Sequence, residues 1–319
     1  MTAGSASGGV LTFGETMALF RGEGAGALTH ERSLRLGIGG AESNVAIGLR
    51  RLGVPAHWIG RVGHDSLGAL VTRELRAEDV DLTVITDDGA PTGIMVKENR
   101  AAGITNVMYY RKGSAGSRLS PADVPAAVIR AAALVHVTGI TAMLSESALD
   151  TVRHVIAVAR EAGVPVSFDL NYRRALCGPE RAGELYRELI ACSDIVFAGA
   201  DEAALAVDAA PPASLAKRLA ALGPAQAVVK LGAHGAVALV DDVAYQQDAI
   251  HITPVDTVGA GDAFVAGYLS EVIAGHEPDD RLLTAARAGA FACLSRGDWE
   301  GLPTTEELRK LGDSEDVTR

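Results

Sequence analysis

Short apolar runs alternate along the chain with longer segments in which apolar residues recur about every 3.6 positions. A short apolar run bounded by turn residues is typical of a buried strand, and the longer period is typical of an amphipathic helix. The alternation predicts an α/β fold, with a mostly parallel sheet covered by helices on both faces. The predicted strands are 56–59, 134–137, 164–168, 195–197, 227–230 and 236–240, and the predicted helices are 41–52, 67–77, 145–162, 180–192, 215–222, 262–274 and 280–295.

Two stretches, 10–20 and 92–111, break this rhythm because they read as extended segments without a helix between them. In the second stretch, two apolar runs flank a turn-like segment at 98–103, which is the pattern of a β-hairpin. A small sheet attached to an α/β body is expected to act as a lid. We predict one principal domain over 10–311, with lid strands from about 10–40 and 92–113 and flexible tails at 1–9 and 312–319.

The composition is that of an ordinary globular protein, with 48% hydrophobic and 22% charged residues among 319. A net charge of −11 and only 4% aromatic residues argue against a nucleic-acid or membrane partner. The three cysteines form no CxxC pair, so a disulfide framework or a structural zinc site is not expected. With neither a signal-peptide pattern nor a long apolar stretch, we expect a cytoplasmic protein.

A glycine-rich segment, Asp256-Thr-Val-Gly-Ala-Gly-Asp262, runs directly into an apolar helix. Backbone N–H groups of Gly259, Ala260 and Gly261, together with the helix N-terminus, would form an anion hole for phosphate. Asp262 in the first turn can accept the proton of an attacking hydroxyl. The alternative is an ordinary helix start capped by an aspartate. The chain carries neither the P-loop motif nor the protein-kinase signatures.

A second glycine-rich motif spans 37–53 and contains Gly39, Gly40 and Asn44. The two glycines allow close approach of a ligand to the backbone, and Asn44 offers a donor and an acceptor to sugar hydroxyls. One alternative is a turn whose glycines only ease packing. The other, a dinucleotide fingerprint, lacks its third glycine.

The two motifs, in this order and roughly 220 residues apart, resemble the ribokinase-like (PfkB) carbohydrate kinase family. The segment 60–68 resembles that family too, and the resemblance extends over about 11–303. It implies a three-layer αβα Rossmann-like body with a β-sheet lid, MgATP as phosphoryl donor and a sugar hydroxyl as acceptor. It also implies Asp262 as the catalytic base, Gly259 to Gly261 as the anion hole, and a monovalent cation, K⁺ or Na⁺, near Asp256.

Two arginines suggest an acidic sugar. Arg111 follows the aromatic pair Tyr109 and Tyr110 in the predicted lid, and Arg173 follows a strong predicted strand. A guanidinium can bind a carboxylate through two hydrogen bonds, and ligands of open α/β sheets bind beyond the strand ends. Each arginine also has an alternative role without a ligand. Arg111 could be a solvated or ion-paired surface residue, and Arg173 could cap a strand end or form an ion pair.

The segments 109–117, 169–173 and 295–303 are similar to those of 2-keto-3-deoxygluconate kinases. This resemblance implies phosphate transfer to the 6-hydroxyl of 2-keto-3-deoxygluconate. Two departures are visible: Met95 stands where an aromatic residue is expected, and Glu202 lacks the usual preceding asparagine. The resemblance places four residues at the substrate, Tyr109, Arg111, Arg173 and Asp298, and one, Asn171, near the nucleotide phosphates.

The segment from Lys230 to Gly235 is predicted to reach the nucleotide, because a glycine turn after a strand leaves room for adenosine and phosphates. The alternative is a plain hairpin turn. The resemblance implies nucleotide contacts at Lys230, Gly232 and Gly235, and again at Gly259 and Gly261 of the anion hole. Magnesium is expected to arrive with ATP, held by phosphates and waters, with Glu202 behind them.

The sequence is therefore compatible with three functions. The first is an ATP-dependent kinase for a sugar acid, the second is a kinase for a neutral ketose such as fructose or ribose, or for a nucleoside, and the third is a sugar-binding protein without catalysis. An exposed lid sheet has edges that favour pairing, so we also expect a homodimer through the lids.

Overall fold

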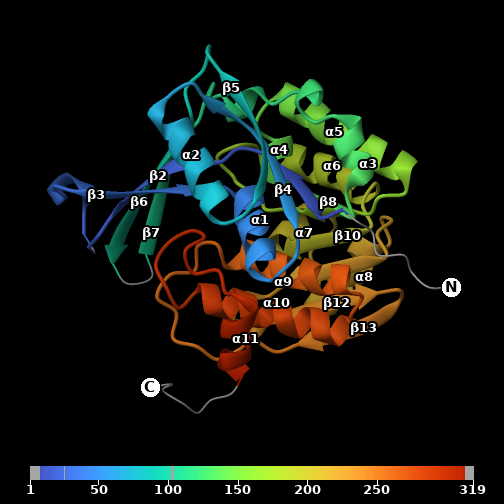
Figure 1. Ribbon diagram of the computed structural model, residues 1–319. Coiled ribbons are helices and arrows are strands. Elements are labelled where there is room, and N and C mark those ends of the chain that lie inside the picture. Colours follow the sequence, from blue (N-terminus) through green and yellow to red (C-terminus); the bar gives the residue numbers. More distant parts are fainter. Residues whose placement is uncertain (1–7, 25, 102–103, 313–319) are drawn as a thin grey trace.

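The computed structural model describes residues 8–24, 26–101 and 104–312. Within them the chain forms a large α/β body of nine strands and a separate four-stranded sheet that projects from one side, at the left of Figure 1. The predicted fold class, an αβα body with a small β-sheet lid, is confirmed.

The body sheet has the order β13-β12-β11-β10-β9-β8-β1-β4-β5. From β5 to β11 each strand pairs in parallel with the next, and β12 pairs antiparallel with both β11 and β13. The strands are β1 (Val10–Phe13), β4 (Ala56–Gly63), β5 (Asp81–Asp87), β8 (Leu134–Thr138), β9 (Val166–Asp169), β10 (Ile195–Gly199), β11 (Gln226–Lys230), β12 (Ala236–Val240) and β13 (Val243–Gln247).

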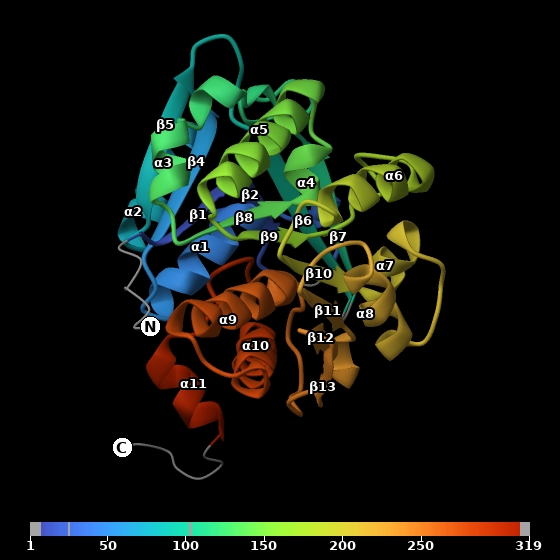
Figure 2. The ribbon, with the colours of Figure 1, turned by 90° about the vertical axis from the view of Figure 1, so that its right-hand side faces the viewer.

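Helices cover both faces of the body sheet, because successive residues of its buried strands point to opposite faces. Val196 and Ala198 pack into one core, and Ile195 and Phe197 pack into the other. Figure 2 shows the two helical layers on either side of the sheet. One layer holds α3 (Ala126–Ala131), α4 (Gly139–Ala142), α5 (Glu146–Ala162), α6 (Pro179–Ile190), α7 (Ala200–Ala206) and α8 (Pro212–Ala220), and the other holds α1 (Ala41–Arg51), α2 (Ser66–Ala77), α9 (Ala260–Ala274), α10 (Pro278–Ala292) and α11 (Thr305–Gly312).

The lid sheet has the order β3-β2-β6-β7. The predicted hairpin is present as β6 and β7, which pair antiparallel. The prediction that lid strands begin at about residue 10 is wrong, because β1 lies inside the body sheet between β8 and β4. The lid strands are β2 (Met17–Gly22), β3 (Leu34–Gly39), β6 (Ile94–Ala101) and β7 (Ile104–Tyr110).

The predicted flexible tails, 1–9 and 312–319, each include a residue that is part of the folded body. The carbonyl of Gly9 accepts a hydrogen bond from the backbone N–H of Ala133 at 3.0 Å, so Gly9 belongs to the body. Gly312 closes the last helix, α11. The remaining tail residues, 1–7 and 313–319, lie outside the described residues.

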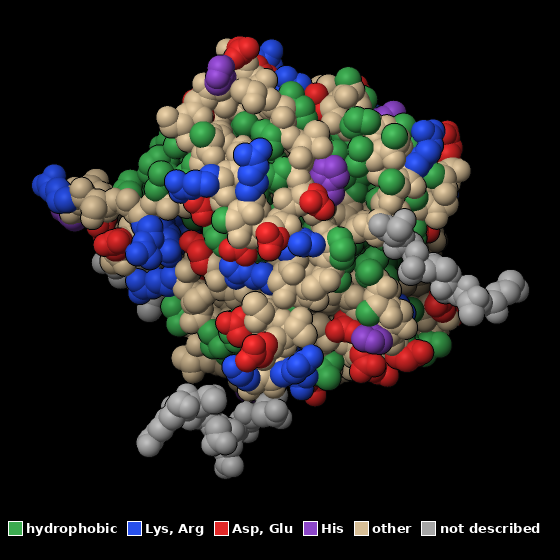
Figure 3. Space-filling view, viewed as in Figure 1, with side chains coloured by type: hydrophobic (Ala, Val, Ile, Leu, Met, Phe, Trp, Pro, Cys, Tyr) green, Lys and Arg blue, Asp and Glu red, His purple; other side chains and the backbone are tan. Residues whose placement is uncertain are grey.

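The surface carries both signs of charge. On the face shown in Figure 3, acidic and basic side chains are mixed, and several basic side chains gather where the lid meets the body. Over the part of the chain that the structure describes, no helix is both long and apolar enough to cross a membrane. The cytoplasmic location expected from the sequence stays a prediction.

Candidate active site

Two adjoining cavities lie at the carboxyl ends of the body strands. The first, of about 570 Å³, is walled on one side by lid residues and on the other by strand ends and the start of α9. The second, of about 380 Å³, is lined mainly by apolar residues. Four residues line both cavities: Lys230, Gly232, Thr257 and Gly261. Because ligands of parallel α/β sheets bind at this edge, the arrangement suits one ligand in each cavity, meeting at the glycine turn.

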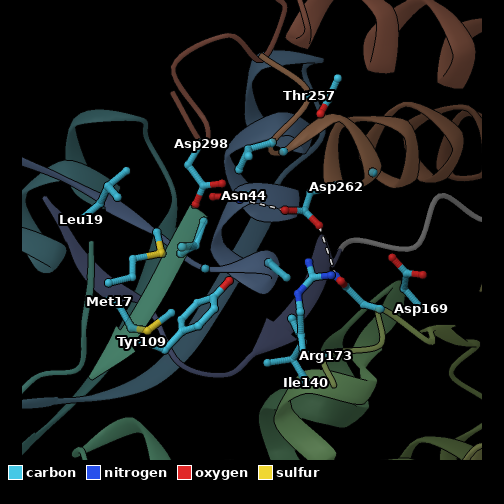
Figure 4. A pocket seen from close by; sticks show the side chains of 18 of the residues that line it. Met17, Leu19, Asn44, Tyr109, Ile140, Asp169, Arg173, Thr257, Asp262 and Asp298 are labelled. Carbon is cyan, nitrogen blue, oxygen red and sulfur yellow. Dashed lines mark hydrogen bonds between the residues drawn. The ribbon is translucent and has the colours of Figure 1, made fainter. Parts of the chain in front are cut away.

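Asp262 lines the first cavity, and two asparagines hold its carboxylate, of which Figure 4 labels Asn44. Asn44 Nδ2 donates to Oδ2 at 2.8 Å, and Asn171 Nδ2 donates to Oδ1 at 3.4 Å. Asn44 Oδ1 is buried and has no hydrogen-bond partner among the described residues, so it can accept from a bound hydroxyl. Burial, reinforced by the carboxylate of Asp298, raises the pKa of Asp262 to about 7. That value suits a group that takes up a proton near neutral pH.

Asp298 is a half-buried carboxylate that lines the first cavity together with Asp262. Burial raises its pKa to about 6, and the ammonium of Lys97 acts in the opposite direction. Gly39 packs directly against this group, since a Cβ atom there would lie 1.9 Å from Asp298 Oδ2. The glycine at the end of β3 therefore leaves the space in which the carboxylate sits.

The turn before α9 has the backbone shape that an anion hole requires. Gly259 caps the helix with φ of +79°, a left-handed conformation that glycine adopts without strain. A Cβ atom at this position would also meet the carbonyl oxygen of Asp298 at 2.0 Å. The first N–H groups of α9 thus point from a helix N-terminus toward the shared border of the two cavities.

Four cationic side chains line the first cavity: Lys97, Arg111, Arg173 and Lys230. Three of them are paired with carboxylates. Lys230 Nζ lies 2.8 Å and 2.9 Å from the two oxygens of Asp169. Burial opposes its charge, but the carboxylate of Asp169 outweighs burial and raises the pKa of Lys230.

Arg173 is different, because its guanidinium has no carboxylate partner among the described residues and donates only to the carbonyl of Tyr172. Its side chain is exposed and points toward Asp262 in Figure 4. Of the cavity-lining cations that the structure describes, Arg173 is the one whose charge is left for a ligand.

Arg111 lies in the first cavity as predicted, but its charge is already paired. Its Nε donates to Glu15 Oε2 at 2.6 Å, and the hydroxyl of Ser114 donates to Oε1 of the same carboxylate. The guanidinium also lies 5.8 Å from the ring centre of Tyr109. The pair is deeply buried, with side chains 10% and 1% exposed for Arg111 and Glu15. The ion-paired alternative for Arg111 is therefore the one observed.

Asp256 does not have the free carboxylate that a monovalent cation site needs. Its Oδ2 lies 2.5 Å from Lys97 Nζ of the lid strand β6. Its Oδ1 accepts from the backbone N–H of Val258 at 3.2 Å. The residues present therefore do not fit the K⁺ or Na⁺ ion that the sequence resemblance implied near Asp256.

The second cavity fits a flat, weakly polar ring system. Its walls include Ile250, Ile252, Pro254 and Phe264. One side is the turn from Gly232 to Gly235, which joins the antiparallel strands β11 and β12 and is thus a hairpin turn as well as a cavity wall.

A comparison with known sequence families decides the assignment. The model of the pfkB family of carbohydrate kinases matches residues 8–305. The chain belongs to the pfkB carbohydrate kinase family. It is accordingly an ATP-dependent carbohydrate kinase.

Individual pfkB relatives agree with this placement. The chain is 36% identical to the 2-dehydro-3-deoxygluconokinase of Bacillus subtilis, over 93% of each chain. It is 34% identical to the 2-dehydro-3-deoxygalactonokinase of Haloferax volcanii, over 95% of this chain and 96% of the relative. The crystal structure of a PfkB protein from Polaromonas sp. JS666 superposes with a TM-score of 0.87 at 33% identity, covering 95% of this chain and 99% of that one.

Most residues predicted from the pfkB motifs come together in the structure. The following line the first cavity: Gly40, Asn44, Tyr109, Arg111, Asn171, Arg173, Glu202, Lys230, Gly232, Gly259, Gly261, Asp262 and Asp298. Gly235 and Ala260 line the second. Gly39 is absent from both linings and acts through its packing against Asp298. Met95, noted as a departure, forms an apolar wall of the first cavity with Met17, Leu19 and Val107.

Three charged site residues were missed, Glu15, Lys97 and Asp169, as were the apolar wall residues Met17, Leu19 and Val107. Lys97 lies two positions after Met95 on a strand, so the strand period placed both on the same face. Glu202 was expected near magnesium. Its two oxygens accept from the backbone N–H groups of Tyr172 at 2.9 Å and Gly199 at 2.7 Å, so it holds the ends of two strands together, and its position behind the magnesium ion stays a prediction.

Proposed function

We propose that this kinase transfers the γ-phosphate of MgATP to the 6-hydroxyl of 2-keto-3-deoxygluconate, which is also called 2-dehydro-3-deoxygluconate. The observation that carries the substrate class is the guanidinium of Arg173, which lies beside Asp262 without a carboxylate partner among the described residues. A planar guanidinium binds a carboxylate through two charge-assisted hydrogen bonds. A neutral ketose offers no such group.

In the proposed reaction, the sugar occupies the first cavity with its primary hydroxyl at Asp262. The carboxylate of Asp262 takes the hydroxyl proton as the sugar oxygen forms a bond to the γ-phosphorus. The bond from that phosphorus to the bridging oxygen breaks, and ADP leaves with the electron pair. Asn44 and Asn171 orient the carboxylate, and the Gly259 to Gly261 turn stabilises charge on the transferring phosphoryl group.

For the nucleotide, we propose that adenine occupies the apolar second cavity and that the phosphates cross the shared border. Lys230 lines both cavities and can reach the phosphates from its position beside Asp169. Magnesium enters with ATP as part of the donor substrate and supplies charge neutralisation at the phosphates.

A coupled ADP-release assay tests the substrate class. The acceptors are 2-keto-3-deoxygluconate, its galactonate epimer, fructose, ribose and adenosine. We expect kcat/KM for the gluconate acid to exceed that for the neutral acceptors by about 100-fold or more, the scale of one lost charge-assisted pair. A preference for fructose, ribose or adenosine would overturn the proposal. A preference for the galactonate epimer would keep the substrate class and make that epimer the substrate instead.

Variants of two adjacent arginines make the assay specific. Arg173→Ala is expected to raise KM for the acid by roughly 100-fold, the loss of a charge-assisted pair at about 2 to 3 kcal/mol. Arg174→Ala is the matched control, because Arg174 is its exposed neighbour and is absent from both cavity linings. Equal effects of the two substitutions would show that Arg173 has no special role.

We further propose that a second copy of the chain covers the outer face of the lid. Leu36, Phe20, Val96 and Met108 lie opposite one another across its four strands. Leu36 is 47% exposed and Met108 37%, whereas Met95 on the inner face is buried against the cavity. An apolar row with exposed ends and half-buried middle members, Phe20 and Val96, suits a self-complementary two-fold contact.

The oligomeric state tests the lid contact. Light scattering after size exclusion is expected to give a dimer for the wild type and a monomer for Leu36→Glu. Val243→Glu, at an exposed apolar position outside the lid, should remain a dimer. A monomeric wild type at high micromolar concentration rejects this part of the proposal.

A further inference from the structure

A lysine occupies the position next to Asp256 at which the resemblance placed a monovalent cation. Lys97 Nζ lies 2.5 Å from Asp256 Oδ2 and donates to the carbonyl oxygen of Gly297 at 2.9 Å. Its side chain is 2% exposed and that of Asp256 is 8% exposed. The pair therefore lies at a site that solvent scarcely reaches.

The surroundings of this ammonium come from three separate parts of the chain. Asp256 precedes the anion-hole turn, Gly297 precedes Asp298, and Lys97 extends from β6 of the lid. The first two parts are joined directly, since the N–H of Val255 donates to the carbonyl of Cys293 at 2.8 Å. The ammonium thus bridges two loops whose oxygens face each other.

An ion at this position would have to displace the ammonium. One oxygen of Asp256 is committed to Lys97 and the other to the backbone N–H of Val258. An ion that displaced the ammonium would leave Lys97 buried without its carboxylate partner, which is strongly unfavourable. A tethered ammonium supplies the same single charge with hydrogen bonds to both loops and without any dependence on ion concentration.

We propose that in this kinase the Lys97 ammonium takes the place of a monovalent cation beside the phosphate-binding turn. Phosphoryl transfer is therefore independent of K⁺ and Na⁺. The inference rests on the assignment of the turn before α9 as the phosphate site. It also means that the positive charge behind the anion hole is contributed by the lid.

The first test compares initial rates of the wild-type enzyme in choline chloride, KCl and NaCl at equal ionic strength, with ATP as its Tris salt. We expect the rates to agree within about twofold, a difference of less than 0.5 kcal/mol in the barrier. Stimulation by K⁺ or Na⁺ of about tenfold or more overturns the inference.

The second test uses thermal unfolding and needs no substrate, so it judges the inference even if the proposed sugar is wrong. Lys97→Met removes the ammonium and keeps a long apolar side chain. We expect K⁺ or NH₄⁺ to raise the unfolding midpoint of this variant and to restore part of its turnover, because an ion that binds only the folded state stabilises it. The wild type and the control Lys112→Met, at an exposed lysine just after the lid strand β7, should respond to neither ion.

The outcomes separate the possibilities. If Lys97→Met folds but neither K⁺ nor NH₄⁺ changes its unfolding midpoint or its turnover, the cation replacement is overturned. Lys97 and Asp256 would then form only a structural ion pair. If Lys97→Met does not fold, Lys97→Gln takes its place, and the wild-type rates in the three salts still decide. Absence of ADP release with every sugar in every salt would count against the proposed function, whereas the unfolding response would still decide the role of Lys97.

Discussion

Asn44, in the first helix α1, donates a hydrogen bond from Nδ2 to Asp262 Oδ2 in α9 across 2.8 Å and 218 positions of sequence. This contact joins the two glycine-rich motifs into one site. It fixes the orientation of the carboxylate, and burial keeps the pKa of that carboxylate near the pH at which a kinase works. The carboxylate that we propose as the catalytic base is thus held by a residue from the opposite end of the chain.

The pH dependence of turnover follows from the raised pKa of Asp262, which burial and Asp298 bring to about 7. The protonated acid cannot accept a proton, so kcat/KM is expected to fall about tenfold per pH unit below pH 7. Asp298→Asn removes one cause of the raised pKa, so the descending limb should move to lower pH. A flat wild-type profile down to about pH 5, as an ordinary carboxyl group would give, contradicts this assignment.

The two ends of α9 offer a matched pair of glycine substitutions. Gly259 and Gly275 both have left-handed φ angles, +79° and +76°. A Cβ atom at Gly259 would meet a carbonyl oxygen at 2.0 Å, whereas one at Gly275 would meet nothing within 4 Å. Gly275→Ala should therefore cost about 1 kcal/mol and leave turnover unchanged. Gly259→Ala should cost on the order of 3 kcal/mol and abolish turnover, as measured by chemical unfolding and the ADP assay.

The buried pair of Arg111 and Glu15 should matter for stability more than an exposed pair. Arg111→Ala leaves Glu15 buried without its partner, so the free energy of unfolding is expected to fall by about 3 to 5 kcal/mol. The control is Arg153→Ala, because Arg153 and Glu188 are 47% and 45% exposed, and the loss there should be below about 1 kcal/mol. Similar losses for both variants in urea unfolding would contradict the structural role of Arg111.

The strong periodic segments of the sequence were enough to predict six of the nine body strands and the larger helices, whereas β5 and β13 were not predicted. The four-residue strand β1 was assigned to the lid, because local periodicity does not reveal which sheet a strand joins. The short helices α3, α4 and α7 were missed, since each contains fewer than two full turns, and the eight-residue α11 was missed as well.

The residues of the candidate site that lie in sequence motifs were predicted, whereas the ion pairs between distant residues were missed. Asp262, Asn44 and Gly259 lie in recognisable segments. The partners of Arg111 and Asp256 lie 96 and 159 positions away, and nothing in the local pattern links them. Only the folded arrangement distinguishes Arg173, whose charge is left for a ligand, from Arg111, whose charge is already paired.

The central claim is that Asp262 accepts the proton of the sugar hydroxyl, and Asp262→Asn tests it most directly. The measurement is kcat in the ADP-release assay, with sugar affinity measured in parallel by calorimetry. We expect kcat to fall by about 1000-fold, within the range for loss of a general base, while the sugar Kd changes less than about threefold. Asp242→Asn, at an exposed turn, is the control and should keep wild-type turnover. An Asp262→Asn enzyme with near-wild-type kcat would contradict the account.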